Sequence, residues 1–184
     1  SPPIWGDSHI FNVGVRHQDH SEFSSRPIYR TGYTVLDGPF SYKLSWGESF
    51  QEAPQRLLYG GWQGIGSNPK LEPAESSTIE LSTTYIRGED RFTLALVEVE
   101  SDRTTSLFAG GATNDLGAQT VRSLELIILK SFDFPGTQEV KAWLNYSHVF
   151  NVHKQTRVES LGDSLTQDQT GPAGNIAEDK LSLG

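Results

Sequence analysis

The sequence contains neither cysteine nor methionine among its 184 residues. Without cysteine the chain forms no disulfide bond and offers no thiolate metal ligand, iron–sulfur cluster or cysteine nucleophile. The chain begins at Ser1, so we expect that a leader, a tag or the initiator methionine has been removed. We expect an extracellular, secreted protein, and an intracellular location stays open.

Long hydrophobic runs are also missing. The longest, Leu94–Val97 and Leu126–Leu129, have four residues each, whereas a helix needs about 20 apolar residues to cross a bilayer. We therefore expect no membrane insertion. The 15 basic and 23 acidic residues give a net charge of -8, which disfavours nucleic acid as a partner. With 35% hydrophobic residues, the chain has enough apolar material for a core and is not disordered throughout.

Helix signals are scarce, and alternation with a period of two recurs up to about residue 158. The clearest case places Phe40, Tyr42, Leu44 and Trp46 on one face of a half-buried strand. Similar patterns cover 9–15, 78–86, 91–99, 123–132 and 138–146, and we expect 91–99 and 123–132 to be central strands covered on both faces. Turn sequences such as Asp37-Gly38-Pro39 and Arg87-Gly88-Glu89-Asp90 lie between them. Seven or so short strands predict an all-β fold, most simply an antiparallel sandwich or a barrel.

A weak internal repeat divides the chain. A strand ending in Phe, followed by a turn with proline and a second strand, occurs at Phe50 and again 82 residues later at Phe132. We expect an N-terminal strand with loops (1–39), a first β-sandwich unit (40–120) and a second, partial unit (121–160). Residues 161–184 are polar and are expected to form a tail or a long loop, with a pair of weak edge strands as the alternative.

Few residues form a recognisable catalytic or metal-binding pattern. His17, Asp19 and His20 have metal-ligand chemistry, but on a strand followed by a loop their side chains diverge, so a solvated loop is favoured. Glu98 and Glu100 lie on the same side of one strand, which fits a glycosidase pair less well than a solvated sheet face. No nucleotide or phosphate motif is present. We therefore expect no catalytic residues, no metal site and no cofactor.

Aromatic residues with polar neighbours give a better lead. A sugar site needs an aromatic platform surrounded by hydrogen-bonding groups. Trp62, in a glycine-rich loop, and Trp143 have such neighbours, and strand parity places Trp143 on the same face as Lys141 and Asn145. A core position for Trp143 is the alternative.

Two segments resemble the H-type lectin domain. Val140-Lys141-Ala142-Trp143-Leu144-Asn145-Tyr146 with Thr156-Arg157-Val158 is similar to the first part of the family pattern. The segments from Arg91 to Leu96 and from Asp102 to Ala112 are similar to the later part. The resemblance implies a β-sandwich that binds N-acetylgalactosamine or related sugars, usually as a trimer. It places Arg157 at the family's sugar-contacting arginine, Lys70 at the equivalent position of the first unit, and Asp102 and Phe108 in the later segment.

We therefore expect a non-enzymatic lectin that binds glycans or glycoproteins of the galactose or N-acetylgalactosamine type, as a homo-oligomer. Its expected ligand-binding residues are Arg157, Trp143, Asn145, Lys70, Trp62, Asp102 and Phe108. A further hypothesis is that residues 9–15 complete the second unit by pairing with 138–158. Two alternatives stay open: a carbohydrate-active enzyme (a glycoside hydrolase or lyase) that uses Glu98 and Glu100 or the His17 cluster, and a structural or interaction module without a ligand.

Overall fold

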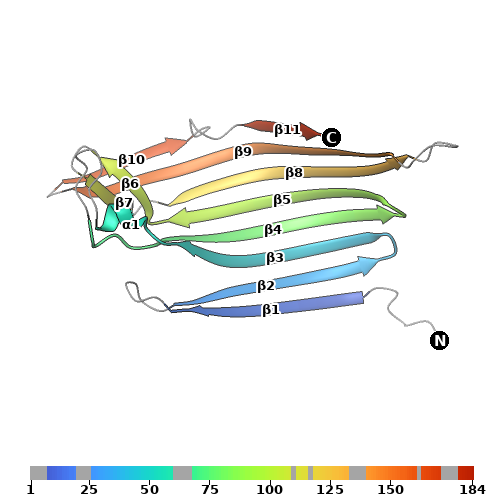
Figure 1. The fold of residues 1–184 in the computed structure, drawn as a ribbon, viewed down its shortest axis with the longest axis horizontal. Coiled ribbons are helices and arrows are strands. Elements are labelled where there is room, and N and C mark those ends of the chain that lie inside the picture. The colour runs from blue at the N-terminus through green and yellow to red at the C-terminus, as the bar shows by residue number, and fades with distance from the viewer. Residues whose placement is uncertain are drawn as a thin grey trace.

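The computed structural model describes residues 8–19, 26–59, 68–108, 111–115, 118–132, 140–160, 163–170 and 178–184. Almost all of them are in β-strands (Figure 1). The strands are β1 (Ser8–Gln18), β2 (Arg26–Asp37), β3 (Phe40–Gln51), β4 (Ala74–Arg87), β5 (Asp90–Asp102), β6 (Thr104–Phe108), β7 (Gly111–Asp115), β8 (Gln119–Phe132), β9 (Val140–Ser160), β10 (Asp163–Thr170) and β11 (Asp179–Leu183). The helix of this described part is α1 (Gln55–Leu58). No helix in these ranges is long and apolar enough to cross a membrane.

Nine strands form one antiparallel sheet in the order β1-β2-β3-β4-β5-β8-β9-β10, and β11 also pairs with β9. Strands β6 and β7 form a separate hairpin. The all-β, antiparallel prediction is therefore confirmed. A second sheet packed face to face is not found among the described residues, so the structure does not show the expected sandwich. The sheet is also not closed: β1 forms one edge, and β10 and β11 lie along the opposite edge (Figure 1).

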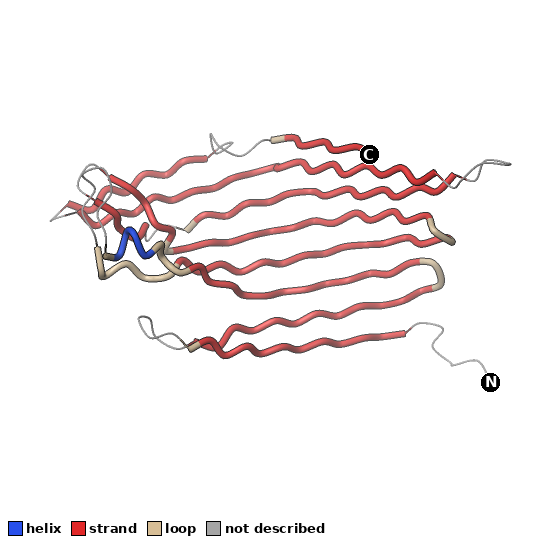
Figure 2. The backbone as a smooth tube through the Cα atoms, in the orientation of Figure 1, coloured by secondary structure: helices blue, strands red, loops and turns tan. Residues whose placement is uncertain are grey.

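The two ends of the sheet differ in their connections. At one end, tight turns join β2 to β3 and β4 to β5, where Gly38 and Gly88 have φ angles of 53° and 61°. Glycine is suited to this left-handed backbone because it has no Cβ. Both turns are those predicted from the sequence. At the other end lie α1 and the β6–β7 hairpin (Figure 2). We call these the short-turn end and the long-loop end.

Little of the sheet is buried. The buried hydrophobic cluster of the described residues lies in the β3–β4 connection and comprises Ala53, Leu57, Leu58 and Leu71. In the strands, by contrast, Phe92 is 41% exposed and Ile127 is 42% exposed. The expectation that 91–99 and 123–132 are covered on both faces is therefore wrong, because a single sheet has no second layer to cover them.

Other details of the chain path differ from expectation. Strand β2 is missing from the sequence-based strands, although its residues alternate clearly. Residues 9–15 pair with β2, at the edge of the sheet opposite β9, so the hypothesis that they complete the segment 138–158 is wrong (Figure 1). Strands β10 and β11 are edge strands within 161–184. The division into units stays a prediction; β8, which starts at Gln119, pairs with β5 in the same sheet.

Candidate functional site

The register of the sheet separates its side chains into two faces. Residues directly opposite each other on neighbouring strands point to the same face. One row of paired residues runs through Phe11, Tyr33, Leu44, Leu81, Leu96 and Leu124. The next runs through Val35, Tyr42, Thr83, Leu94, Leu126, Tyr146 and Leu181. Together with their neighbours of the same parity, such as Val13, Val15, Phe40, Trp46, Ile79, Tyr85, Phe92, Ile128 and Leu144, these residues form what we call the apolar face.

The apolar face is exposed although it is hydrophobic. Leu44 is 51% exposed, Leu81 54% and Leu96 49%. Along β3 the apolar segment from Phe40 to Trp46 measures about 20 Å at roughly 3.3 Å per residue. No element of the described part of the chain packs over these residues in the sheet. A continuous apolar surface of this extent requires a nonpolar environment or a partner that covers it.

Aromatic rings gather at the short-turn end of the apolar face. The ring of Phe40 lies 6.2 Å from that of Tyr42 and 5.1 Å from that of Tyr85. Tyr85 is in turn paired with Phe92 on β5. Such rings have an apolar body, and tyrosine adds a polar tip, so a belt of them suits the boundary between a nonpolar and an aqueous phase.

The opposite face, which we call the polar face, is lined mostly by polar and small side chains. Near its centre Lys43 forms an ion pair with Glu80 at 3.3 Å, and the Ser82 hydroxyl donates a hydrogen bond of 3.0 Å to the same carboxylate. Its members include Asn12, Arg16, Arg30, Gly32, Thr34, Ser41, Lys43, Ser45, Glu80, Ser82, Thr84, Arg91, Thr93, Ala95, Glu125, Lys141, Trp143, Asn145, Lys180 and Ser182.

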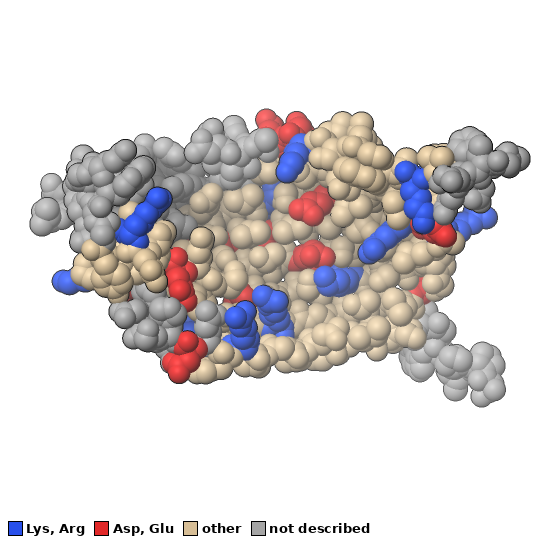
Figure 3. Space-filling view, viewed as in Figure 1, with Lys and Arg blue, Asp and Glu red and all other residues tan. Residues whose placement is uncertain are grey.

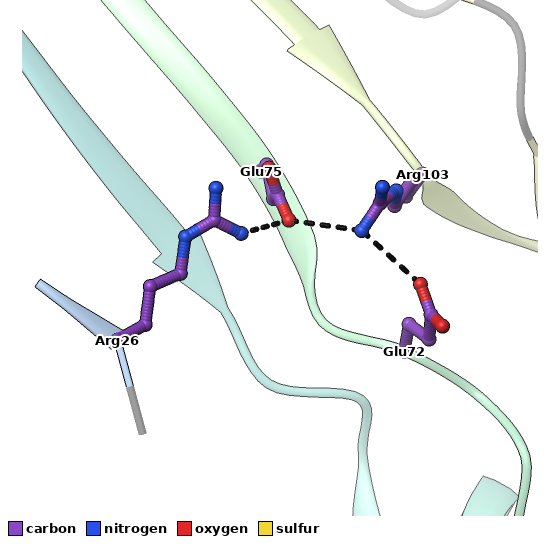
Figure 4. A network of polar contacts seen from close by, with 4 residues as sticks. All are labelled: Arg26, Glu72, Glu75 and Arg103. Carbon is purple, nitrogen blue, oxygen red and sulfur yellow. Dashed lines mark hydrogen bonds and ion pairs between the residues drawn. The ribbon is translucent and has the colours of Figure 1, made fainter. Parts of the chain in front are cut away.

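An ion-pair network joins several elements at the long-loop end (Figure 4). The guanidinium of Arg26, at the start of β2, contacts the carboxylate of Glu75 on β4. Arg103 lies 3.1 Å from Glu75 and 3.1 Å from Glu72. The Arg26 hydrogen bond holds the pKa of Glu75 below its ordinary value, and Glu75 in turn raises the pKa of Arg26. Arg103 has a φ angle of 51°, an uncommon conformation for a residue other than glycine. The network therefore fixes the corner between β5 and β6 against the base of the β3–β4 connection.

A cavity of about 280 Å³ lies beside this network. It opens where β2 separates from β3, and the Glu48 carboxylate there accepts a hydrogen bond of 3.2 Å from the Tyr29 amide. Its lining includes Arg26, Ile28, Glu48, Phe50, Glu75, Glu100 and Asp102. These groups give the cavity an acidic lining with one guanidinium.

The carboxylates Glu98 and Glu100 lie on one side of β5, as their parity predicts. Glu98 is bound to Arg122 at 2.5 Å, whereas Glu100 lines the cavity. Their paired residues on β4 are Ile79 and Ser77. Since neither of these is a carboxylate, β4 supplies no partner for a glycosidase pair. His17 is the last residue but one of β1, and His20 lies outside the described residues. Within the described ranges no group of three His, Asp or Glu side chains is placed to hold a metal ion.

The expected sugar-binding residues are spread over the molecule. Trp143 and Asn145 share the polar face of β9, in agreement with their parity. Arg157 lies 12 residues farther along the same strand, or roughly 40 Å at ~3.3 Å per residue. Lys70 is in the β3–β4 connection and Asp102 ends β5 at the cavity. Phe108 ends β6, and Trp62 lies outside the described residues. The structure therefore does not bring these residues into one site.

Comparison with protein families decides between the possible meanings of this two-faced sheet. The model of the family described as TonB dependent receptor-like, beta-barrel, matches residues 4–184. The chain belongs to this family. A comparison with curated proteins found no match.

Membership in the TonB-dependent receptor-like family corrects five expectations. The resemblance to H-type lectin domains is wrong, and with it the lectin function, because the family match covers residues 4–184, including both segments on which the resemblance rested. Glycan partners are not supported, and the expected lack of membrane insertion conflicts with a family of membrane receptors. The family places the protein outside the cytoplasm, in agreement with the expectation that it is not an intracellular protein. It does not support the expected secreted lectin.

The signal for a receptor barrel was present in the sequence. Strands with outward apolar and inward polar residues, separated by turns, are typical of barrel proteins that cross membranes. The apolar positions of Phe40–Trp46 predict a half-buried strand. The same alternation fits a face that contacts lipid, and alternation alone does not distinguish the two environments.

Proposed function

We propose that the chain forms part of the wall of an outer-membrane receptor barrel with a role in transport. The apolar face contacts the hydrocarbon of the membrane, and the polar face lines the interior. The observation that carries this proposal is the exposed apolar band, which crosses β1 to β5, β8, β9 and β11 without a covering layer in the described part of the structure. Membership in the receptor family supports the same assignment.

The dimensions of the band suit a membrane. The outward apolar band of a barrel of this kind is about 25 Å tall and carries aromatic belts at its boundaries. The apolar segment of β3 measures about 20 Å, and the rings of Phe40, Tyr42 and Tyr85 mark its boundary at the short-turn end. Above the band, towards the long-loop end, the same face carries the charged residues Glu48, Glu98, Glu100 and Arg122.

The orientation follows from the connections. Outer-membrane barrels have short turns on the periplasmic side and longer loops on the outer surface. We therefore assign the Gly38 and Gly88 turns to the periplasmic side. The ion-pair network and the cavity lie on the outer side, where a receptor meets its ligand. The free edge of β1 needs a paired strand in the membrane, since unpaired backbone groups are costly in hydrocarbon.

Vesicle flotation tests this proposal. The chain is refolded in the presence of phospholipid vesicles, floated on a density gradient and washed with alkaline carbonate. We expect it to stay with the vesicles after the wash and to keep the circular dichroism of a β-sheet protein. A chain that remains in the aqueous fraction, or that carbonate removes, would contradict the proposal.

A further inference from the structure

The charges of the chain are distributed unevenly between the two faces. Although the net charge is -8, the polar face carries more basic than acidic side chains in the described part of the sheet. Its basic residues are Arg16, Arg30, Lys43, Arg91, Lys141 and Lys180, and its acidic residues are Glu80 and Glu125. Figure 3 shows basic side chains spread over one side of the sheet, with acidic side chains between them. An acidic protein thus presents a basic surface on its polar face.

Two of these basic residues lie close together near the long-loop end. Arg16 is paired with Ile28, and Arg30 is paired with Gly14, so the two arginines are diagonal neighbours on β1 and β2. Side chains in this relation have Cα atoms about 7–8 Å apart, within reach of long side chains. Both arginines point to the polar face and are exposed.

Both residues that are paired with Arg30 are glycines, which have no side chain. They are Gly14 on β1 and Gly47 on β3. A Cβ atom at position 47 would lie 3.2 Å from Cγ of Arg30, which is tighter than an ordinary contact. The arginine side chain therefore passes over Gly47, and neither of its directly paired residues covers it with a side chain.

The two arginines have no ionic partner within the described residues. Lys43 is neutralised by Glu80 and Lys141 by Glu89, at 3.3 Å and 2.6 Å. Arg16 and Arg30 take part in none of the ion pairs found among the described residues. Neighbouring like charges repel each other unless an anion lies between them. Guanidinium groups bind carboxylate and phosphate oxygens through two parallel hydrogen bonds.

We propose that Arg16 and Arg30 bind an anionic solute, with phosphate or carboxylate groups, at the long-loop end of the polar face. The proposal rests on the proposed function, in which the polar face lines the barrel interior. Asn12 on β1 and Ser45 on β3 are both paired with Gly32, the next residue of β2 on this face after Arg30. They add uncharged hydrogen-bonding groups beside the two arginines. An anion entering from the outer side meets this pair of arginines before the central Lys43–Glu80 pair.

Isothermal titration of the vesicle-reconstituted chain tests the proposal. The probes are inorganic pyrophosphate and succinate, which distinguish phosphate from carboxylate recognition, and choline is the cationic control. We compare the unchanged chain with Arg16→Gln, Arg30→Gln and the double variant. Arg122→Gln, on the other face, is the matched control. We expect an anion to bind, each single variant to weaken its binding about 5- to 10-fold, and added salt to weaken it further.

The outcomes separate this inference from the proposed function. If the chain floats with vesicles but binds neither anion, or if the double variant binds as well as the unchanged chain, the arginine site is wrong and the barrel proposal stands. Equal weakening by Arg122→Gln would also overturn the site, since the effect would then come from total charge. If the chain does not enter vesicles at all, the proposed function fails, and the inference that rests on it fails as well.

Discussion

A charge placed on the apolar face should destabilise the protein strongly in a membrane. We choose Leu44→Arg near the middle of the apolar segment of β3, with Ser45→Arg as its matched control. The two residues are adjacent in sequence and point to opposite faces. Ser45 is paired with Glu80, so an arginine there gains an acidic neighbour.

The expected magnitude follows from the exposure of Leu44. Since this side chain is 51% exposed, its contacts within the protein account for only about half of the ~1.5–3 kcal/mol that complete burial of a leucine contributes, or about 1 kcal/mol. An arginine on the lipid face near the bilayer midplane costs about 2–4 kcal/mol. We expect Leu44→Arg to lower the free energy of unfolding in vesicles by about 3–5 kcal/mol, and Ser45→Arg by less than about 1 kcal/mol.

The assay is reversible unfolding by guanidinium from phospholipid vesicles, followed by the fluorescence of the four tryptophans. The difference between the two variants carries the test, because both add the same charge and a similar volume. Equal destabilisation by Leu44→Arg and Ser45→Arg would refute the assignment of the faces. A loss of about 1 kcal/mol or less for Leu44→Arg would show that this face is in contact with water.

Three further predictions concern separate parts of the structure. Gly88→Ala should lower the free energy of unfolding by about 1–2 kcal/mol because residue 88 has a φ of 61°, whereas Glu89→Ala in the same turn should cost less than about 1 kcal/mol; denaturant titration measures both. Glu75→Gln should lower the thermal unfolding temperature at neutral pH, because the ionised carboxylate holds Arg26 and Arg103. The pKa of Glu75 is held below its ordinary 4.5, so this stabilisation is present above pH 4.5 and is lost as the pH falls through the lowered value; a difference between the variants that does not shrink as the pH is lowered below 4.5 would contradict this. Phe40→Leu should destabilise the vesicle-bound chain by about 1 kcal/mol relative to the unchanged chain, because it keeps an apolar side chain but loses the ring contacts with Tyr42 and Tyr85, as comparison of the unfolding midpoints will show.

The strands themselves could largely be predicted from the sequence. Alternation around Phe40–Trp46 and the turns at Gly38 and Gly88 reflect local chemistry, and the structure has strands and turns at these positions. The alternation places Trp143 and Asn145 on one face correctly, too. The missing β2 shows the limit of this approach, because Ile28 and Leu36 are apolar residues on the otherwise polar side of its alternation.

The environment of the sheet could not be predicted in the same way. The apolar face of a strand has the same sequence pattern whether it faces a protein core or lipid, so the alternation from Phe40 to Trp46 predicts a half-buried strand in either environment. The criterion of about 20 consecutive apolar residues applies to helices, whereas a strand crosses a bilayer with about 9–11 residues, only half of which are apolar. The four-residue runs Leu94–Val97 and Leu126–Leu129 therefore gave no membrane signal.

The contacts of Arg30 and the ion-pair network at the long-loop end could not be predicted from the sequence either, because both depend on the register of the strands. The pairing of Arg30 with Gly14 and Gly47, and the meeting of Arg26, Glu75 and Arg103, join residues from strands far apart in the sequence. Likewise, β9 continues without interruption from Asn145 to Arg157, 12 residues farther on, which separates two residues expected to share a sugar site.

Solvent accessibility along β4 tests the central claim most directly. Since the chain has no cysteine, single cysteines from Ile79 to Tyr85 can each carry a spin label without competing sites. In vesicles, we expect labels at 79, 81, 83 and 85 to collide with oxygen, which concentrates in hydrocarbon, and labels at 80, 82 and 84 to collide with a water-soluble nickel complex instead. An accessibility profile without a period of two, or with nickel access at Leu81, would contradict a lipid-facing apolar face.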